Sequence, residues 1–291
     1  MANEKFNIYQ AITDRVISQL EKGEIPWHKP WIGGSNKGAF NRVSKKSYSL
    51  LNQLILKHDG EYATYKQWSE LGGTVRKGEK SEIVVFWKPC EVTETTKEGK
   101  TVKKTIPYLK YISVFHISQV DGVKPLSSDE QIFEHEPIEE AEEIKRNYIQ
   151  RENFKIMEVN SDRAFYSPSQ DFIQIPSKEQ YKDINEFYST LFHEMIHSTG
   201  HASRLGRFDN TAKAAAFGSA EYSKEELVAE IGGAALMNLV GIETMATFMN
   251  STAYIQNWLK VLKSDNRFIV SASSKAEKAV KYILGDSSKD D

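Results

Sequence analysis

His193-Glu194-Met195-Ile196-His197 lies in a stretch, residues 185–199, whose apolar side chains recur with the period of a helix. Two histidines four positions apart project from one side of a helix, about one turn apart, which is the spacing that two imidazole ligands of a single zinc ion need. Glu194 flanks them and can act as general base toward water at the metal. The stretch therefore predicts a metal site with ligands His193 and His197 and the catalytic residue Glu194.

The third ligand must come from elsewhere, because a catalytic zinc ion usually has three protein ligands and one open position. His201 is a candidate, but eight residues along one helix turn it away from His193. The metzincin pattern needs a histidine at position 203, where this chain has Ser203. Glu226, on a second predicted helix, is the better candidate, as in zincins of the gluzincin type. Glu230, four residues later, is placed to orient a ligand histidine from the second shell.

Interpretations of these residues that involve no catalysis remain possible beside the metal site. Glu225 is interpreted as a solvated acid in the first turn of its helix, where it suits the helix dipole. The two histidines can be ordinary core residues, and the acids of the second helix a charged stripe. A peptidase also needs a donor for the oxyanion, and the sequence does not choose among three nearby residues: Tyr222, His201 and Arg204. A predicted edge strand over 172–175 can pair with an extended peptide.

Charge divides the 291 residues into two parts. Residues 1–120 hold 19 Lys and Arg against 12 Asp and Glu, and the remainder holds 19 against 28. A basic part suggests contact with a polyanion, although chance segregation explains the split equally well. Nine acids and two prolines between positions 121 and 143 indicate an exposed connector. We expect a DNA-binding domain over 1–120, an acidic linker over 121–143 that runs into the next helix, a metallopeptidase domain over 144–285 and a polar tail over 286–291.

Strand patterns are concentrated ahead of a run of helices, which argues for an α+β fold. The expected helices are 8–22, 50–56, 65–71, 138–151, 185–199, 223–239, 254–264 and 274–284. The expected strands are 83–87, 108–117, 154–159, 164–166 and 172–175.

Tryptophans alternate with basic residues in the first 120 positions. Base stacking on aromatic rings beside a cationic groove holds single-stranded DNA without sequence preference, but aromatic residues are also ordinary core residues. Trp68 and Trp87, on a predicted helix and strand, are interpreted as core. Trp27 and Trp31 lie in a predicted loop and are expected to contact DNA. The candidate DNA-binding residues are Trp27, Lys29, Trp31, Lys45, Lys46, Arg76, Lys77 and Lys80.

The composition also excludes several classes of protein. The single cysteine, Cys90, rules out an internal disulfide and a cysteine-rich zinc ribbon. No segment approaches the length of a membrane span, and the N-terminus has no apolar signal region. We expect a soluble, cytoplasmic protein without a membrane partner.

Several motifs in the same order resemble ArdC-type antirestriction proteins. Residues 23–31, 48–52 and 71–80, with the strand 111–119, resemble the family's N-terminal single-stranded-DNA-binding domain, and the resemblance adds Tyr48 to the DNA-binding candidates. Residues 193–201 and 226–230 are similar to its zincin-like metallopeptidase domain. The resemblance implies metal ligands His193, His197 and Glu226. Ser198 departs from the family, where a Trp is common.

The family is carried by plasmids, integrative elements and phages, and the resemblance implies protection of incoming DNA from host restriction. The expected partners are single-stranded DNA and a protein or peptide substrate, and the expected cofactor is one zinc ion per chain. The alternative is a non-enzymatic protein that covers single-stranded DNA and has a structural or unused metal site. A nuclease is disfavoured because the acids follow zincin spacing.

Overall fold

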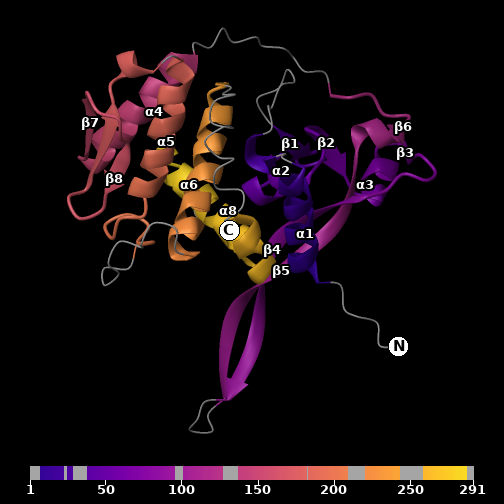
Figure 1. Ribbon diagram of the computed structural model, residues 1–291. Helices are drawn as coiled ribbons and strands as arrows, with labels where there is room; N and C mark the ends of the chain where they lie inside the picture. Colours follow the sequence, from indigo (N-terminus) through magenta and orange to yellow (C-terminus); the bar gives the residue numbers. More distant parts are fainter. Residues whose placement is uncertain are drawn as a thin grey trace. The chain divides into compact units, whose positions relative to one another are not determined.

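The computed structural model of the chain describes residues 7–22, 25–28, 38–95, 101–126, 137–181, 183–208, 220–242 and 258–286. Its contacts form two compact units, each a mixture of helices and strands (Figure 1). The α+β fold is thereby confirmed. One unit comprises Met1–Ala11 and Lys37–Ser127, and the other comprises Ile12–Asn36 and Ser128–Asp291. Residues 12–36, which the sequence analysis assigned to the first domain, belong to the second unit.

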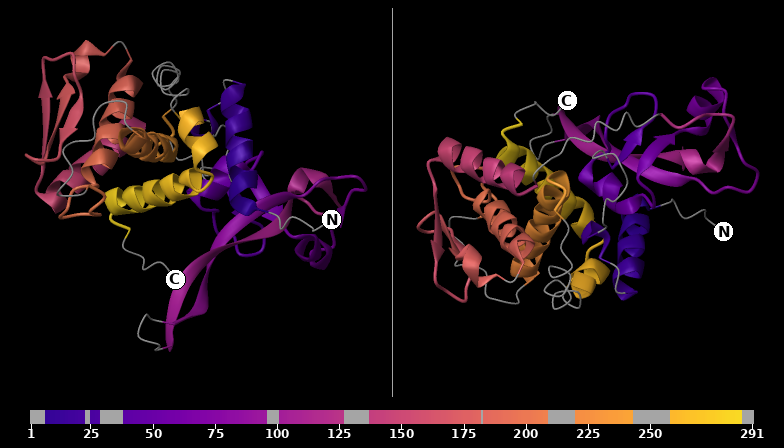
Figure 2. Two further views of the ribbon diagram at one scale, coloured as in Figure 1. Left: turned by 60° about the horizontal axis from the view of Figure 1, so that its bottom comes forward. Right: turned by 90° about the horizontal axis from the view of Figure 1, so that it is seen from above.

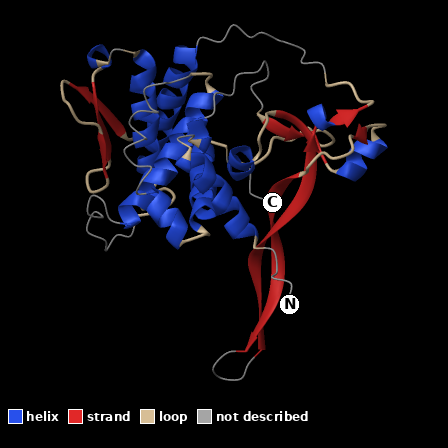
Figure 3. Cartoon of the chain, turned by 45° about the vertical axis from the view of Figure 1, so that its right-hand side comes forward, coloured by secondary structure: helices blue, strands red, loops and turns tan. Residues whose placement is uncertain are grey.

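The first unit is built on a four-stranded sheet in the order β1-β2-β5-β4. β1 and β2 are parallel, and the other neighbours are antiparallel. β4 and β5 form a long hairpin that extends beyond the rest of the sheet (Figure 3). The strands are β1 (Ala39–Asn41), β2 (Gly60–Ala63), β4 (Glu82–Thr95) and β5 (Thr101–His116), and a separate pair joins β3 (Thr74–Val75) to β6 (Val120–Asp121).

Two amide side chains of helix α2 (Leu50–Ile55) attach it to this sheet. Asn52 accepts a hydrogen bond from the backbone N–H of Val85 at 2.7 Å and donates one to its carbonyl at 2.8 Å. Gln53 bonds both backbone groups of Ala39 at 2.9 Å. Burial of these polar groups is tolerated because each is paired. Helix α3 (Tyr65–Glu70) contributes Trp68, which is fully buried as expected.

The second unit places helix α5 (Ile184–Ser198) between a small sheet and helix α6 (Ala220–Leu239), as the views in Figure 2 show. Helix α8 (Phe268–Leu284) packs against α5 and α6, and residues 258–264 are also helical. The sheet order is β7-β9-β8, with β7 (Lys155–Val159), β9 (Phe172–Pro176) and β8 (Phe165–Ser167). Helix α4 (Pro137–Glu152) precedes the sheet in the chain.

The expectation that residues 172–175 form an edge strand is wrong. β9 is the central strand, paired in parallel with β7 and antiparallel with β8. Its backbone hydrogen bonds are used on both sides, so it offers no free edge to an extended peptide. Within the described residues, the outer strands of this sheet are β7 and β8.

The core of the second unit joins the two ends of the chain. Trp27 is 2% exposed, and its ring lies edge-on to that of Trp258 at 5.2 Å between centroids. Thr13, on helix α1 (Ile8–Glu21), donates its hydroxyl to the carbonyl of Asn266 at 2.8 Å. The expectation that Trp27 is an exposed DNA contact is therefore wrong, because apolar packing against a distant helix holds the ring inside.

Within the described residues, no helix combines the length and the apolar character needed to cross a membrane.

Candidate metal centre

The helix that carries the histidines is stabilised at both ends. The Asp183 carboxylate accepts a hydrogen bond from the N–H of Asn185 at 2.9 Å and begins α5. At the other end, Arg204 donates Nε–H to the carbonyl of Ser198 and Arg207 donates to that of Ile196, both at 2.8 Å. These bonds pair terminal carbonyl groups that a helix leaves without an internal partner, and so fix the last turn, which contains His197.

Helix α6 approaches α5 closely because it has two glycines where the helices meet. A Cβ added at Gly232 would lie 2.7 Å from Cδ1 of Ile196, and one at Gly233 would lie 3.3 Å from the backbone nitrogen of His193. Any larger residue would push the helices apart or force Ile196 to move. The glycines therefore let α6 present its acids to the histidines of α5.

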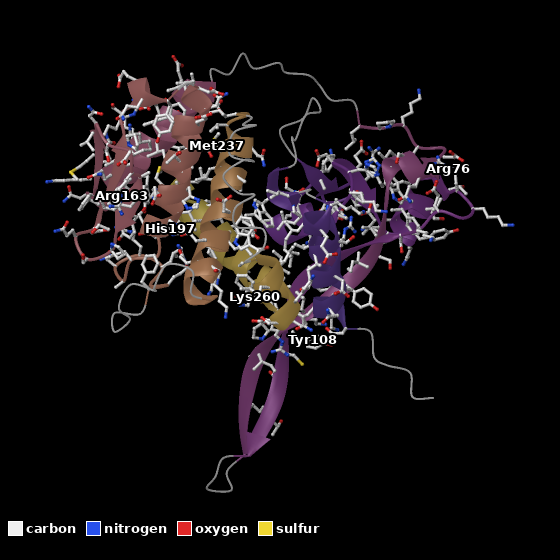
Figure 4. The ribbon with its side chains drawn as sticks, in the orientation of Figure 1. Arg76, Tyr108, Arg163, His197, Met237 and Lys260 are labelled. Carbon is white, nitrogen blue, oxygen red and sulfur yellow. The ribbon has the colours of Figure 1, made fainter. Side chains whose placement is uncertain are left out.

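The predicted ligands come together between these two helices, where Figure 4 labels His197. The Nε2 atoms of His193 and His197 are 3.1 Å apart. The Glu226 oxygens lie 3.5 Å from the first of these nitrogens and 3.4 Å from the second. Glu194 is only 8% exposed and lies close enough to both histidines to interact with their charges.

This arrangement fits a divalent metal ion. Ligand atoms at zinc distances on a tetrahedron are separated by about 3.4 Å. The two Nε2 atoms are 3.1 Å apart, and each has one Glu226 oxygen near this distance, Oε2 at 3.5 Å from His193 and Oε1 at 3.4 Å from His197. Two imidazole nitrogens and one carboxylate oxygen form the donor set typical of a zincin-type centre, with a fourth position left for water or substrate.

A second carboxylate accompanies each histidine. Glu230 Oε1 lies 3.6 Å from Nδ1 of His193, which is the geometry predicted for it. Glu225 Oε1 lies 3.5 Å from Nδ1 of His197 and accepts a 2.7 Å bond from Arg207. Such outer carboxylates fix the orientation and tautomer of a ligand histidine.

The interpretation of Glu225 as a solvated first-turn acid is wrong. α6 begins at Ala220 rather than at residue 223, so Glu225 lies in its second turn and faces α5. Adjacent residues of a helix do not share a face, so its position beside Glu226 gave no sequence signal of this contact.

The charges of the cluster attract one another strongly in the metal-free protein. Burial opposes protonation of His197, but hydrogen bonds with Glu225 and Glu226 outweigh it and raise its pKa to about 10. Burial also lowers the pKa of His193, but the hydrogen bond with Glu226 outweighs this effect, so the pKa of His193 is raised. Burial alone would raise the pKa of Glu226, yet the two histidines hold it well below its usual range. Protons thus occupy donor atoms that a metal ion would use.

Other residues near the motif have different roles. His201 lies in the turn beyond α5 and shares a 2.7 Å hydrogen bond with Ser203, away from the three ligands. Arg204 is buried in an ion pair with Asp171. The side chain of Tyr222 lies outside the described residues. Ser198 is fully buried and bonded to Tyr148 at 2.8 Å, so it faces α4 rather than the rim of the site.

The DNA-binding candidates of the first unit are only partly gathered on its surface. Lys45, Lys46, Lys77 and Lys80 are exposed. Arg76 is exposed, but it pairs with Glu79 at 2.9 Å and Asp121 at 3.3 Å. Tyr48 is half-buried against the ring of Tyr62. Lys29 and Trp31 lie outside the described residues.

Trp87 is exposed, although it was predicted to lie in the core. It is 46% exposed on β4, because the hairpin extends past the helices that cover the rest of the sheet. The interpretation of this residue as core is wrong.

The fold and the donor set define the class of this protein: a zincin-like metal-binding unit joined to a second, sheet-based unit. Family comparison agrees, since residues 142–275 match the zincin-like metallopeptidase model and residues 6–115 match the N-terminal domain of the anti-restriction factor ArdC. The chain belongs to the ArdC-type antirestriction family.

Relatives over the full length support this assignment. The antirestriction protein ArdC of plasmid R388 is 32% identical in its metal-free crystal structure, with a TM-score of 0.76 over 97% of this chain and 98% of that one. Its Mn(II)-bound structure gives 31% identity and a TM-score of 0.75 over 98% and 100%. The y4eC protein of Sinorhizobium fredii is 31% identical over 95% of this chain and 91% of its own length.

Two Escherichia coli DNA primases named TraC are also similar. One is 35% identical over 98% of this chain, and the other is 33% identical over 95% of it. The chain spans only 28% and 20% of their own lengths.

Proposed function

We propose that this protein protects DNA entering a cell on a mobile element by binding it as a single strand and hydrolysing a protein at a zinc centre. The observation that carries the proposal is the convergence of His193, His197 and Glu226 on one point, with Glu194 beside it. The charge asymmetry of the sequence supports contact of the first unit with a polyanion. The proposal places the protein in the cytoplasm of a cell engaged in DNA transfer.

A zinc ion held by these residues supplies Lewis-acid chemistry, acidifying water and polarising a carbonyl group. The existence of a Mn(II)-bound structure of the R388 relative supports the binding of a divalent ion by this protein. The carboxylate of Glu194 accepts a proton at the start of hydrolysis and returns it to the leaving amine. Glu225 and Glu230 hold the two imidazoles in position from their Nδ1 sides.

Elemental analysis of purified protein tests the centre first. About one zinc per wild-type chain, largely lost in Glu226→Ala, supports a three-ligand site. Little metal in wild type after zinc is added contradicts it.

Protection of DNA then separates the enzymatic proposal from simple coverage. Unmodified plasmid is transferred into a restricting host that contains wild type, Glu194→Gln or the control Glu186→Gln, a matched substitution two turns away on α5. We expect protection to be lost only with Glu194→Gln. Equal protection by that variant would mean that the protein acts by covering the strand and that its metal site is structural.

A further inference from the structure

One face of the β4–β5 hairpin alternates exposed apolar and basic residues. Paired residues of an antiparallel ladder share a face, and so do alternate residues of each strand. The register pairs Phe86 with Lys110 and Lys88 with Tyr108. The neighbouring pairs of the same parity are Val84–Ile112 and Cys90–Ile106. We name the Phe86 face by its exposed members: Phe86, Lys88, Cys90, Ile106, Tyr108, Lys110 and Ile112.

The aromatic rings of this face are open to solvent. Phe86 is 39% exposed and Tyr108 is 58% exposed, and both isoleucines are exposed as well. Figure 4 labels Tyr108 on the hairpin. Contiguous apolar groups at a protein surface mark a place of interaction. Phe86 and Tyr108 are diagonal neighbours on this face, because each is paired with a lysine two positions from the other, so both rings are available on one surface.

The charge of the Phe86 face is positive. Lys88 and Lys110 are exposed, and neither has an ion-pair partner among the described residues. Glu82, the acid nearest the base of this face, is buried and accepts hydrogen bonds from the Lys57 N–H and the Tyr62 hydroxyl. Among the side chains that the structure describes, no carboxylate therefore offsets the two lysines where the rings are exposed.

Over residues 83–89 and 107–113, the opposite face of the same hairpin has rings without charges. Trp87 and Tyr111 are 46% and 47% exposed there. Its other positions over 83–89 and 107–113 are Ile83, Val85, Pro89, Pro107, Leu109 and Ser113. Rings together with lysines thus occur on the Phe86 face alone within these ranges.

We propose that the Phe86 face binds the single strand, with bases stacked on Phe86 and Tyr108 and phosphates paired with Lys88 and Lys110. The inference rests on the proposed binding of single-stranded DNA and specifies where it occurs. Stacking suits an unpaired strand because its bases are free to leave their neighbours, and it tolerates any sequence because every base has a π face. A second copy of this face would bring its own lysines against them, so like charges disfavour self-association there.

Titration of a fluorescent oligothymidylate followed by anisotropy tests the assignment. Loss of two stacking contacts in Phe86→Ala/Tyr108→Ala should weaken binding by roughly tenfold or more. Two controls remove exposed tyrosines elsewhere in the unit: Tyr111→Ala on the opposite face and Tyr65→Ala on α3, where Tyr65 is 61% exposed. Both should bind within twofold of wild type.

Two further measurements make the test independent of folding defects. Lys88→Gln/Lys110→Gln should lower the slope of log affinity against log salt by about 1.4, the value for two phosphate contacts on a single strand. Cys90, the one cysteine of the chain, lies exposed on the Phe86 face. Saturating oligothymidylate should slow its alkylation several-fold in the wild-type protein.

The outcomes separate this inference from the function on which it rests. Wild-type binding that the Phe86 face variants leave unchanged overturns the location but leaves single-strand binding intact. Absence of wild-type binding overturns the proposed function itself. A wild-type dimer that the same variants dissociate would show that a second copy covers the face, and would also overturn the inference.

Discussion

Glu225 Oε1 lies 3.5 Å from Nδ1 of His197, on the side of the imidazole away from the nitrogen that faces Glu226. Two adjacent acids of α6 therefore contact one histidine at both of its nitrogens. Glu225 is itself held by Arg207, which also donates to the carbonyl of Ile196 on α5. Arg207 thus stabilises both the C-terminal end of α5 and Glu225, the carboxylate that contacts His197.

Glu225→Gln should weaken metal binding by about 10–100-fold, because an outer partner of a ligand histidine is replaced by a neutral one. Arg207→Lys should act in the same direction, since it loses the fork that holds Glu225. Competition with a chromogenic chelator measures both. Arg204→Lys is the control, because Arg204 also bonds a carbonyl at the end of α5 but pairs with Asp171 instead. If it weakens metal binding equally, helix-end stability rather than Glu225 is responsible.

Metal affinity should rise with pH between about 6 and 9. The pKa values of His193 and His197 are raised in the metal-free cluster, so protons must leave before a metal binds. Each proton displaced gives up to about a tenfold change in affinity per pH unit. Calorimetry in buffers of different ionisation enthalpy measures the protons released, and pH-independent binding without proton release would contradict the prediction.

Stability of the metal-free protein should change in the opposite direction. A raised folded-state pKa contributes stability that is complete below the unfolded value, 6.5 for histidine, and is lost as pH rises through the folded value, about 10 for His197. The melting temperature with chelator present should fall between pH 7 and 10. In His197→Gln this part of the pH dependence should disappear, and its persistence would assign the effect to other groups.

Gly232→Ala should destabilise the protein by about 1–3 kcal/mol despite the better helix propensity of alanine. The new methyl group would overlap the fully buried Ile196 side chain. Ile196→Val removes the nearest atom, so the double variant should be more stable than the sum of the single effects predicts. Chemical denaturation of the four proteins gives this coupling, and strict additivity would show that the helices separate instead.

Trp27→Ala should cost about 3–5 kcal/mol of stability, as expected for truncating a large core side chain. Trp27→Phe should keep most of that packing and leave oligothymidylate affinity unchanged, because the ring is buried against Trp258. Thermal unfolding and anisotropy provide the two readouts. Weaker DNA binding by Trp27→Phe at an unchanged melting temperature would contradict this prediction and show that Trp27 contacts DNA.

The sequence was most informative where a periodic pattern and a chemical motif coincide. The apolar rhythm of residues 185–199 and the i, i+4 histidines predicted α5 and its ligands, and the structure brings Glu226 to them as predicted. Glu225 was missed because the start of α6 was placed three residues late, which changes the turn in which an acid lies.

Tertiary context decided the remaining errors. Trp27 was expected to be exposed but is buried, because it packs against Trp258, which is distant in the sequence. Trp87 was expected to be buried but is exposed, because its part of the hairpin extends past the helices that cover the sheet. β9 became central because β7 pairs with it in parallel, a contact that local patterns do not reveal. The short parallel pair β1–β2 was not predicted for the same reason.

The discontinuity of the second unit has a consequence for biosynthesis. Residues 12–36 leave the ribosome before residues 37–127, yet their partners, Trp258 and Asn266, are made more than a hundred residues after that segment. The sheet-based unit can complete its folding first. During that time the apolar side chains of residues 12–27 that pack in the second unit remain uncovered. A fragment started after residue 127 would lack the part of its core that surrounds Trp258. The core of the metal-binding unit can therefore be completed only after residues 258–266 have been synthesised.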